Sequence, residues 1–283
     1  MPQPVLTRFA PSPTGFLHRG HAYSALLAYK FAQKMQGHFL LRIEDIDRQR
    51  CRETYIPPMI EDLKWLGIHW QGDIRRQSQH FPDYQKALNR LKDMGLVYPC
   101  VCSRREILDD DPAFGPEGVI YSGRCRGQDV DLSRPHVWRL DMQAATAYLK
   151  QHNILPRGWH DGVHGFQSLD VSQIGDVVLV RKDTPTSYHL SVVVDDALQA
   201  ISHVIRGMDL FHATHIHCVL QALLDMPQPL YIHHPLMTNA EGKKFAKSER
   251  SETLQSIREA GVTAQDLIES LPPIDKLLDR LSF

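Results

Sequence analysis

The chain has 283 residues, of which 42% are hydrophobic and 23% are charged, and its formal net charge at pH 7 is −1. These values are typical of a globular protein and leave room for two domains, or for one domain with a large insertion. The near-zero charge excludes a protein that binds nucleic acid through an overall basic surface. Any RNA contact must therefore use local clusters such as Arg48–Arg52 or Arg104–Arg105.

The sequence also disfavours membrane insertion, export and a disulfide framework. No apolar run approaches the roughly 18 residues that suggest a membrane span. Thr7 and Arg8 interrupt the apolar stretch at the N-terminus, so it does not resemble a signal peptide. The five cysteines are too few and too unevenly spaced for a disulfide scaffold. We therefore expect a cytoplasmic protein that makes no membrane contact.

The first predicted elements are a strand, a turn and a helix. Residues 5–9 are mostly apolar and predict a buried strand, and the Pro-Ser-Pro-Thr-Gly run at 11–15 predicts a turn. His18, Gly20 and His21 then open a segment with helical periodicity. The free N–H groups and the dipole of a helix N-terminus attract an anion. Because the two histidines add donors there, the sequence predicts a phosphate-binding site.

Further strands and helices are predicted up to about residue 95. Phe39–Ile43 predicts a second strand, which ends at Glu44. Helices are predicted from Pro57 to about Leu66, and over Phe81–Met94. Residues 99–135 are then rich in Cys, Gly, Pro and Asp. This stretch predicts an insertion with a small structure of its own.

Strands and helices return after the insertion. Strands are predicted at Val177–Arg181, Ser191–Val194 and Val204–Arg206, a helix over Ala213–Leu224, and short helices within Thr253–Leu281. The pattern is therefore strand and helix, insertion, and strand and helix again. It predicts an α/β fold with a doubly wound parallel (Rossmann-like) sheet, an inserted subdomain and a short helical C-terminal region.

The expected domain boundaries follow from this pattern. The two halves of a nucleotide-binding catalytic domain are expected at 1–95 and 176–235, and the insertion between them at 96–175. Residues 236–283 are expected to form a lysine-containing loop and the helical C-terminal region.

Two motifs resemble those of class I aminoacyl-tRNA synthetases. His18-Arg19-Gly20-His21 resembles the ATP-binding His-Ile-Gly-His signature, and the residues before it, Arg8 to Gly15, resemble the glutamyl branch of these ligases. Lys244-Phe245-Ala246-Lys247-Ser248 resembles the Lys-Met-Ser-Lys-Ser loop, with both lysines retained but Phe and Ala in the middle.

The resemblance implies how ATP would bind. Two lysines on a mobile loop can supply positive charge as pyrophosphate leaves. The implied catalytic residues are His18, His21 and Lys247, with Mg²⁺ on the phosphates. The implied ATP-binding residues are His18, Gly20, His21, Lys244 and Lys247.

An acidic amino acid needs a guanidinium group for its carboxylate and a carboxylate for its ammonium group. Arg8 in the first strand and Glu44 at the carboxyl end of the second strand are suitably placed for these roles. The resemblance to glutamyl-tRNA synthetases implies a larger glutamate site, made of Arg8, Phe9, Ala10, Pro11, Ser12, Glu44, Tyr188 and Arg206.

Three cysteines within the insertion favour zinc. Cys100, Cys102 and Cys125 are soft ligands in close sequence proximity, although buried cysteines without a metal would show the same pattern. Tetrahedral zinc needs a fourth ligand. The Cys-x-Cys…Tyr-x-x-x-Cys order resembles the zinc site of short glutamyl-tRNA synthetase relatives and implies Tyr121, while His136 is the conventional alternative. The role would be structural, with one zinc ion per chain.

The resemblance also implies the reaction and the partners. The residues after 249 are too few for the anticodon-binding domain of full-length glutamyl-tRNA synthetases, so none is expected. The chain thus resembles the truncated paralogues of that family, which use ATP to activate glutamate and transfer it to queuosine in tRNA(Asp). The alternatives are a minimal glutamyl-tRNA synthetase that charges the tRNA 3′ end, and a non-catalytic RNA-binding relative. A monomer is expected.

Overall fold

A parallel sheet forms the centre of the molecule, as the alternation of strands and helices predicts. The computed structural model describes residues 4–237 and 252–281. One parallel set contains β1 (Leu6–Phe9), β2 (His38–Ile43) and β3 (Arg75–Arg76). The other contains β11 (His203–Gly207), β12 (Leu230–His234) and β8 (Gly158–Asp161). The α/β class with a parallel sheet is therefore confirmed.

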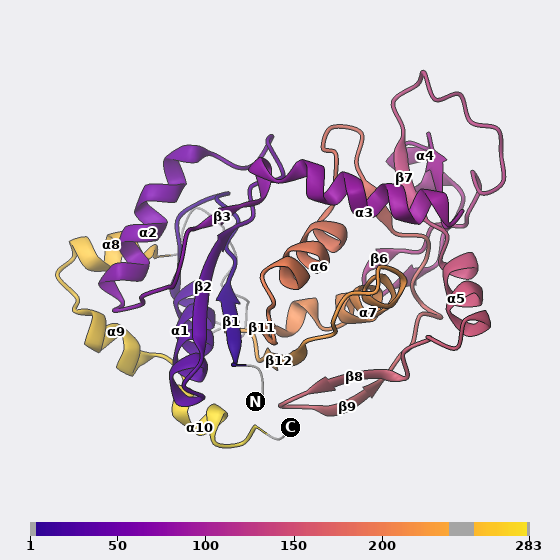
Figure 1. Ribbon diagram of the computed structural model, residues 1–283. Coiled ribbons are helices and arrows are strands. Elements are labelled where there is room, and N and C mark those ends of the chain that lie inside the picture. Colours follow the sequence, from indigo (N-terminus) through magenta and orange to yellow (C-terminus); the bar gives the residue numbers. More distant parts are fainter. Residues whose placement is uncertain (1–3, 238–251, 282–283) are drawn as a thin grey trace.

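The two sets meet where β1 lies beside β11 (Figure 1). The backbone N–H of Ser202, just before β11, donates to the carbonyl oxygen of Leu6 at 3.0 Å, and the Ser202 hydroxyl accepts from the Leu6 N–H at 2.7 Å. The chain thus moves outward from β1 to β2 in its first half and outward from β11 to β12 in its second half. Such a reversal of strand order opens a crevice at the carboxyl ends of the central strands.

The predicted helical segments correspond to α1 (Arg19–Lys34), α2 (Ile56–Trp65), α3 (Phe81–Asp93), α7 (Ala213–Leu223), α8 (Leu254–Glu259), α9 (Ala264–Ser270) and α10 (Ile274–Leu278). The bounds of α2, α3 and α7 agree with the prediction to within two residues, and α8, α9 and α10 lie within the range predicted for the short C-terminal helices. In the part of the chain that the structure describes, no helix is long and apolar enough to cross a membrane.

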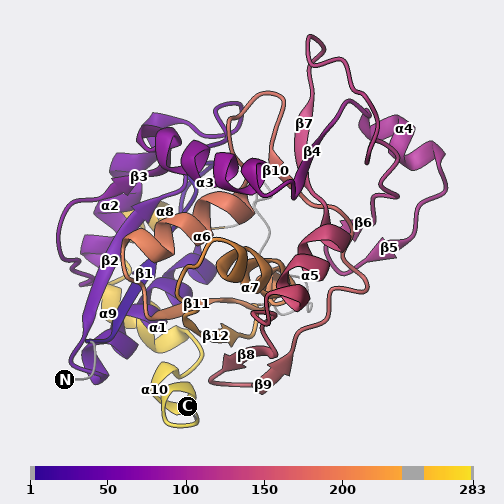
Figure 2. The same ribbon diagram turned by 45° about the vertical axis from the view of Figure 1, so that its right-hand side comes forward.

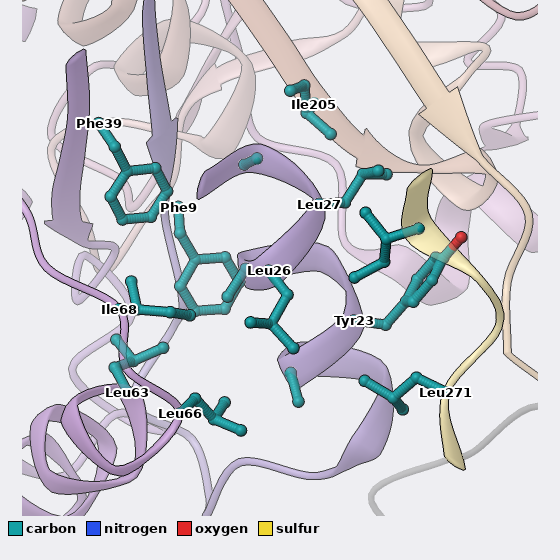
Figure 3. Packing of buried hydrophobic residues seen from close by; sticks show 14 of the residues in the cluster. Phe9, Tyr23, Leu26, Leu27, Phe39, Leu63, Leu66, Ile68, Ile205 and Leu271 are labelled. Carbon is teal, nitrogen blue, oxygen red and sulfur yellow. The ribbon is translucent and has the colours of Figure 1, made fainter. Parts of the chain in front are cut away.

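One hydrophobic cluster joins the start and the end of the chain through α1. Figure 3 shows Tyr23, Leu26 and Leu27 of α1 among residues of β1, β2, β11 and the segment after α2. The C-terminal helices and their connections add the buried residues Leu254, Ile257, Leu267, Leu271, Ile274 and Leu278. Full burial of one such aliphatic side chain contributes about 1.5–3 kcal/mol, so this segment is a substantial part of the core.

The insertion contributes β4 (Val97–Cys100) and β7 (Val137–Leu140) to a separate antiparallel sheet, in which β7 pairs with β4 and with β10 (Val178–Val180), a strand beyond the expected end of the insertion at residue 175. It also holds α4 (Arg104–Asp109), the β5–β6 hairpin (Phe114–Gly115, Gly118–Val119) and α5 (Met142–Gln151). Figure 2 shows α4 and this hairpin on the side of the molecule opposite to α2 and α9.

The chain returns to the parallel sheet within the stretch expected to be the insertion. There β8 and β9 (Gly165–Ser168) form a hairpin, and β8 pairs with β12. The boundaries given above for the domains remain predictions.

The strand predicted at Ser191–Val194 is wrong, because these residues lie in helix α6 (Tyr188–Leu198). All four side chains are buried. The prediction failed because a short apolar run that is buried on every side has no periodicity to distinguish a helix from a strand.

Candidate active site

A cavity of about 490 Å³ lies at the carboxyl ends of β1 and β11, where the strand order reverses. Every described residue that the sequence assigns to ATP or glutamate lines it: Arg8, Phe9, Ala10, Pro11, Ser12, His18, Gly20, His21, Glu44, Tyr188 and Arg206. The sequence analysis did not assign Ser24, Asp209, His234 and several apolar residues that also line it. Lys244 and Lys247 lie outside the described residues.

The two histidines cap the start of α1 by accepting backbone hydrogen bonds. His18 Nδ1 accepts from the N–H of Gly20 at 3.1 Å, and His21 Nδ1 accepts from the N–H of His18 at 3.2 Å. Because Nδ1 is the acceptor in both rings, the neutral imidazoles carry their protons on Nε2. Each ring can therefore present an N–H donor to an anion beside the helix N-terminus.

Arg8 is oriented by a buried carboxylate on α6. Its Nε and Nη2 atoms donate to the two carboxylate oxygens of Asp196 at 2.9 and 3.2 Å. Arg42 Nη1 donates to the same carboxylate at 2.7 Å. Burial alone would raise the pKa of Asp196, but the charges of the two arginines hold it below its usual value. This fork-to-fork pairing fixes the plane of the Arg8 guanidinium.

Glu44 stands at the cavity end of β2 and is also tied to Arg42. The Nη2 atom of Arg42 lies 3.2 Å from a carboxylate oxygen of Glu44, whose side chain is 11% exposed. Burial raises the pKa of Glu44, while the charges of Arg42 and Arg8 oppose that rise. Glu44 is thus a cavity-lining carboxylate of the kind that can receive an ammonium group.

Next to Asp196 on α6, Asp195 accepts hydrogen bonds from Arg75, Gln77 and Tyr84 at 2.8–3.1 Å. Its carboxylate is fully buried, and Arg42 Nε lies 3.8 Å away. The network joins β2, β3, α3 and α6, and Arg42 links it to Glu44 in the wall of the cavity. The sequence reasoning did not foresee this network, since its members come from distant segments; Arg75 and Asp195, for example, are 120 residues apart.

Arg206 lies at the end of β11 and is held by uncharged groups. Its Nε donates to His233 Nε2 at 2.9 Å and its Nη2 to the Thr214 hydroxyl at 2.7 Å. Its Nη1 lies 3.4 Å from the Tyr188 hydroxyl and 3.3 Å from His217 Nδ1. Burial, followed by the charge of Arg206, keeps the pKa of His217 well below its usual value, so that ring is neutral.

The insertion brings the predicted zinc ligands together. The sulfur atoms of Cys100, Cys102 and Cys125 lie within 4.8 Å of one another, and those of Cys102 and Cys125 are 3.4 Å apart. The Tyr121 hydroxyl lies 3.3 Å from Cys100 Sγ and 3.4 Å from Cys102 Sγ. His136 is not in this group; its Nδ1 atom lies 2.9 Å from the carbonyl oxygen of Arg134.

This donor set fits zinc. Two sulfurs on one tetrahedral zinc lie about 3.8 Å apart, given a Zn–S bond of about 2.3 Å. Burial would raise the pKa of Cys125, but the Tyr121 hydroxyl and other hydrogen bonds lower it to about 7, so a thiolate forms readily near neutral pH. Zinc binds the thiolate form of cysteine.

Comparisons with known proteins identify the class to which this fold and cavity belong. Residues 4–272 match the family model described as tRNA synthetases class I (E and Q), catalytic domain. The chain therefore belongs to this family of class I tRNA synthetases.

Two kinds of relative differ in length. The chain is 44% identical over 279 residues to a protein of Rhodobacter capsulatus named glutamyl-Q tRNA(Asp) synthetase, covering 93% of this chain and 98% of the relative. It is 35% identical to a glutamate–tRNA ligase of Aquifex aeolicus, covering 94% of this chain but 56% of the relative.

A solved structure shows the same difference. The crystal structure of a glutamate tRNA ligase from Elizabethkingia meningosepticum, in complex with its amino acid, superposes with a TM-score of 0.69 at 26% identity. The alignment covers 92% of this chain and 53% of that chain. The chain thus spans about half the length of the glutamate–tRNA ligases that it matches.

Proposed function

We propose that the protein activates glutamate with ATP and transfers it to the queuosine base of tRNA(Asp). The observation that carries the proposal is the cavity itself. It places two arginines and the carboxylate of Glu44 beside the N-terminus of α1. An acidic amino acid and a nucleotide phosphate need this combination of groups side by side. The name and the matching length of the Rhodobacter capsulatus relative support the queuosine acceptor.

In the proposed complex, Arg8 and Arg206 bind the carboxylates of glutamate, and Glu44 receives its ammonium group. The segment from Phe9 to Ser12 and the hydroxyl of Tyr188 complete the walls. His18 and His21 donate from Nε2 to the phosphates of ATP, and the backbone at Gly20 allows a close approach. Mg²⁺ bound with ATP neutralises part of the phosphate charge.

The first step joins a carboxylate oxygen of glutamate to the α-phosphorus of ATP, while the bond from that phosphorus to the β-phosphate oxygen breaks and pyrophosphate leaves. No general base is needed, because the carboxylate is ionised at neutral pH. Catalysis then depends on positioning and on charge stabilisation. In the second step, a hydroxyl of the queuosine ring attacks the carbonyl carbon of the adenylate, and AMP leaves.

A label-transfer assay tests the acceptor. Radiolabelled glutamate, ATP and separated tRNAs are supplied, and the labelled nucleotide is identified. We expect label on queuosine of tRNA(Asp), no label on tRNA that lacks this base, and survival of the label after a nuclease removes the 3′ terminal adenosine. Label at the 3′ end of a glutamate or glutamine tRNA would instead support the minimal synthetase. Absence of glutamate-dependent ATP–pyrophosphate exchange would support a non-catalytic relative.

The partners and the regions beyond the cavity are part of the same proposal. The clusters at Arg48–Arg52 and Arg104–Arg105 would contact phosphates next to the modified base, because single-stranded nucleotides are held by pockets with flanking charge. We further propose a monomer, with the insertion at 96–175 and with the lysine-containing loop and the helical C-terminal region at 236–283.

Lys247→Ala is expected to lower the rate of adenylation about a hundredfold. The charge of Lys247 should matter most as pyrophosphate leaves, and loss of one such contact costs about 3 kcal/mol. ATP–pyrophosphate exchange measures the rate, and its dependence on glutamate concentration should change little. Lys276→Ala, in the short helix α10, is the control. An unchanged exchange rate in Lys247→Ala would contradict the assignment of this loop.

Cys125→Ser is expected to lose bound zinc and to loosen the insertion, while glutamate activation persists at least in part. The reason is that the cysteine cluster lies on the insertion, outside both halves of the catalytic domain. Metal analysis of protein purified without chelators gives the zinc content, and limited proteolysis reports on the insertion. Cys51→Ser, whose sulfur is not in the cluster, should keep its zinc. Zinc-free wild-type protein would contradict the site.

A further inference from the structure

Arg206 differs from Arg8 in what holds it. Arg8 is paired with the carboxylate of Asp196, which neutralises much of its charge. The groups that bond to Arg206 are two imidazoles, a phenol and a hydroxyl, all uncharged. Of these, His233 Nε2 accepts from Nε of Arg206 at 2.9 Å, and so fixes the direction of the guanidinium plane.

The hydrogen bonds determine the tautomer of His233. A guanidinium group can only donate, so the Nε2 atom of His233 must be unprotonated to accept from Arg206. The proton of the neutral ring is then on Nδ1, which lies 2.7 Å from an oxygen of Asp161. Both side chains are completely buried. Burial lowers the pKa of His233 to about 4, which agrees with a neutral ring.

Hydrogen bonds to both oxygens of the Asp161 carboxylate hold it in place and favour its ionised form. The oxygen that faces His233 Nδ1 also accepts from the backbone N–H of His233 at 3.1 Å. The other oxygen accepts from the N–H groups of Val163 and His164 at 2.9 and 3.0 Å. Burial alone would raise the pKa of Asp161, but these hydrogen bonds hold it below its usual value.

We propose that His233 and Asp161 are positioning residues for the binding of the acidic amino acid. Asp161 selects the tautomer of His233 that accepts at Nε2, and His233 then aims the guanidinium of Arg206 into the cavity. Because a neutral ring separates the carboxylate from the arginine, Arg206 keeps its charge for the carboxylate of the substrate. This inference rests on the proposed role of Arg206 in glutamate binding.

Glutamate-dependent ATP–pyrophosphate exchange tests the positioning role. His233→Leu removes the acceptor and should raise the KM for glutamate about tenfold or more, since a hydrogen bond to a charged group carries at least that factor. We expect kcat to change by less than about threefold, because the reacting atoms are not contacted. His233→Gln can offer an oxygen near the position of Nε2 and should restore part of the affinity.

A second variant changes the tautomer and keeps the histidine. The amide of Asp161→Asn can donate to Nδ1, which moves the proton of His233 to Nε2 and abolishes acceptance from Arg206. We expect the KM for glutamate to rise as in His233→Leu. His203→Leu is the matched control, because His203 is a buried histidine at the opposite end of β11 from Arg206. Its KM should equal that of the wild type.

Nitrogen-15 NMR of histidine-labelled wild-type protein reads the tautomer directly, and the signals of His233 are those that disappear in His233→Gln. We expect a protonated Nδ1 and an unprotonated Nε2. A proton on Nε2 would overturn the inference, and so would an unchanged KM in a folded His233→Leu. Wild-type protein without glutamate-dependent exchange would instead refute the proposed function. If His233→Leu and Asp161→Asn fail to fold, the wild-type spectrum, assigned with His233→Gln, still decides.

Discussion

Replacing Arg42 with methionine is expected to lower the free energy of unfolding by about 3–5 kcal/mol, because the change leaves buried carboxylates without their partner. The Arg42 side chain is completely buried, with Asp196 at 2.7 Å, Glu44 at 3.2 Å and Asp195 at 3.8 Å. Removing one partner of a buried ion pair destabilises a protein much more than removing one partner of a surface ion pair.

Urea unfolding, monitored by circular dichroism, measures the effect of Arg42→Met as a shift in the urea concentration at the unfolding midpoint relative to the wild type. Lys34→Met is the control, since Lys34 pairs with Asp279 at 2.6 Å but both side chains are solvent-exposed. Its effect should stay within about 1 kcal/mol. Equal midpoints for Arg42→Met and Lys34→Met would show that the buried network contributes nothing to stability.

Arg206→Leu is expected to weaken glutamate binding by about 2–5 kcal/mol, which is roughly thirtyfold to several thousandfold in KM. The leucine leaves the substrate carboxylate in the cavity without the guanidinium that would pair with it. The dependence of ATP–pyrophosphate exchange on glutamate concentration measures the effect.

Arg206→Lys separates charge from geometry. Lysine keeps the positive charge but cannot donate from two parallel N–H groups, so we expect an intermediate KM. Arg90→Leu, which removes an arginine bonded to the carbonyl oxygen of Leu224, should leave the KM unchanged. A KM within about threefold of the wild type for Arg206→Leu would remove this arginine from the proposed glutamate site.

The sequence allowed the cavity to be assembled in outline but not the groups behind it. His18, His21 and Arg8 belong to one short segment, whose strand–turn–helix pattern can be predicted from its own residues. The resemblance to glutamyl-tRNA synthetases predicted Arg206. Asp161 and His233 are 72 residues apart and show no pattern in the sequence, so only the pairing of β8 with β12 brings them together.

Helix α6 shows a second limit of prediction from the sequence. Asp195 and Asp196 follow three valines, and this composition is typical of a strand that ends in a polar turn. Both carboxylates are instead inside the molecule, where arginines from β1, β2 and β3 compensate their charge. A local sequence pattern shows which residues are apolar. It does not show the oppositely charged partners that allow a carboxylate to be buried, because these partners come from distant segments.

The cluster around α1 has a consequence for synthesis on the ribosome. Strand β1 is made first and pairs with β2, yet its neighbour on the other side, β11, begins only at His203, and Leu278 is the last buried residue of the α1 cluster. The nascent chain must therefore carry an uncovered apolar helix face until almost all of it has emerged. Such delayed closure exposes apolar surface to non-native association during synthesis.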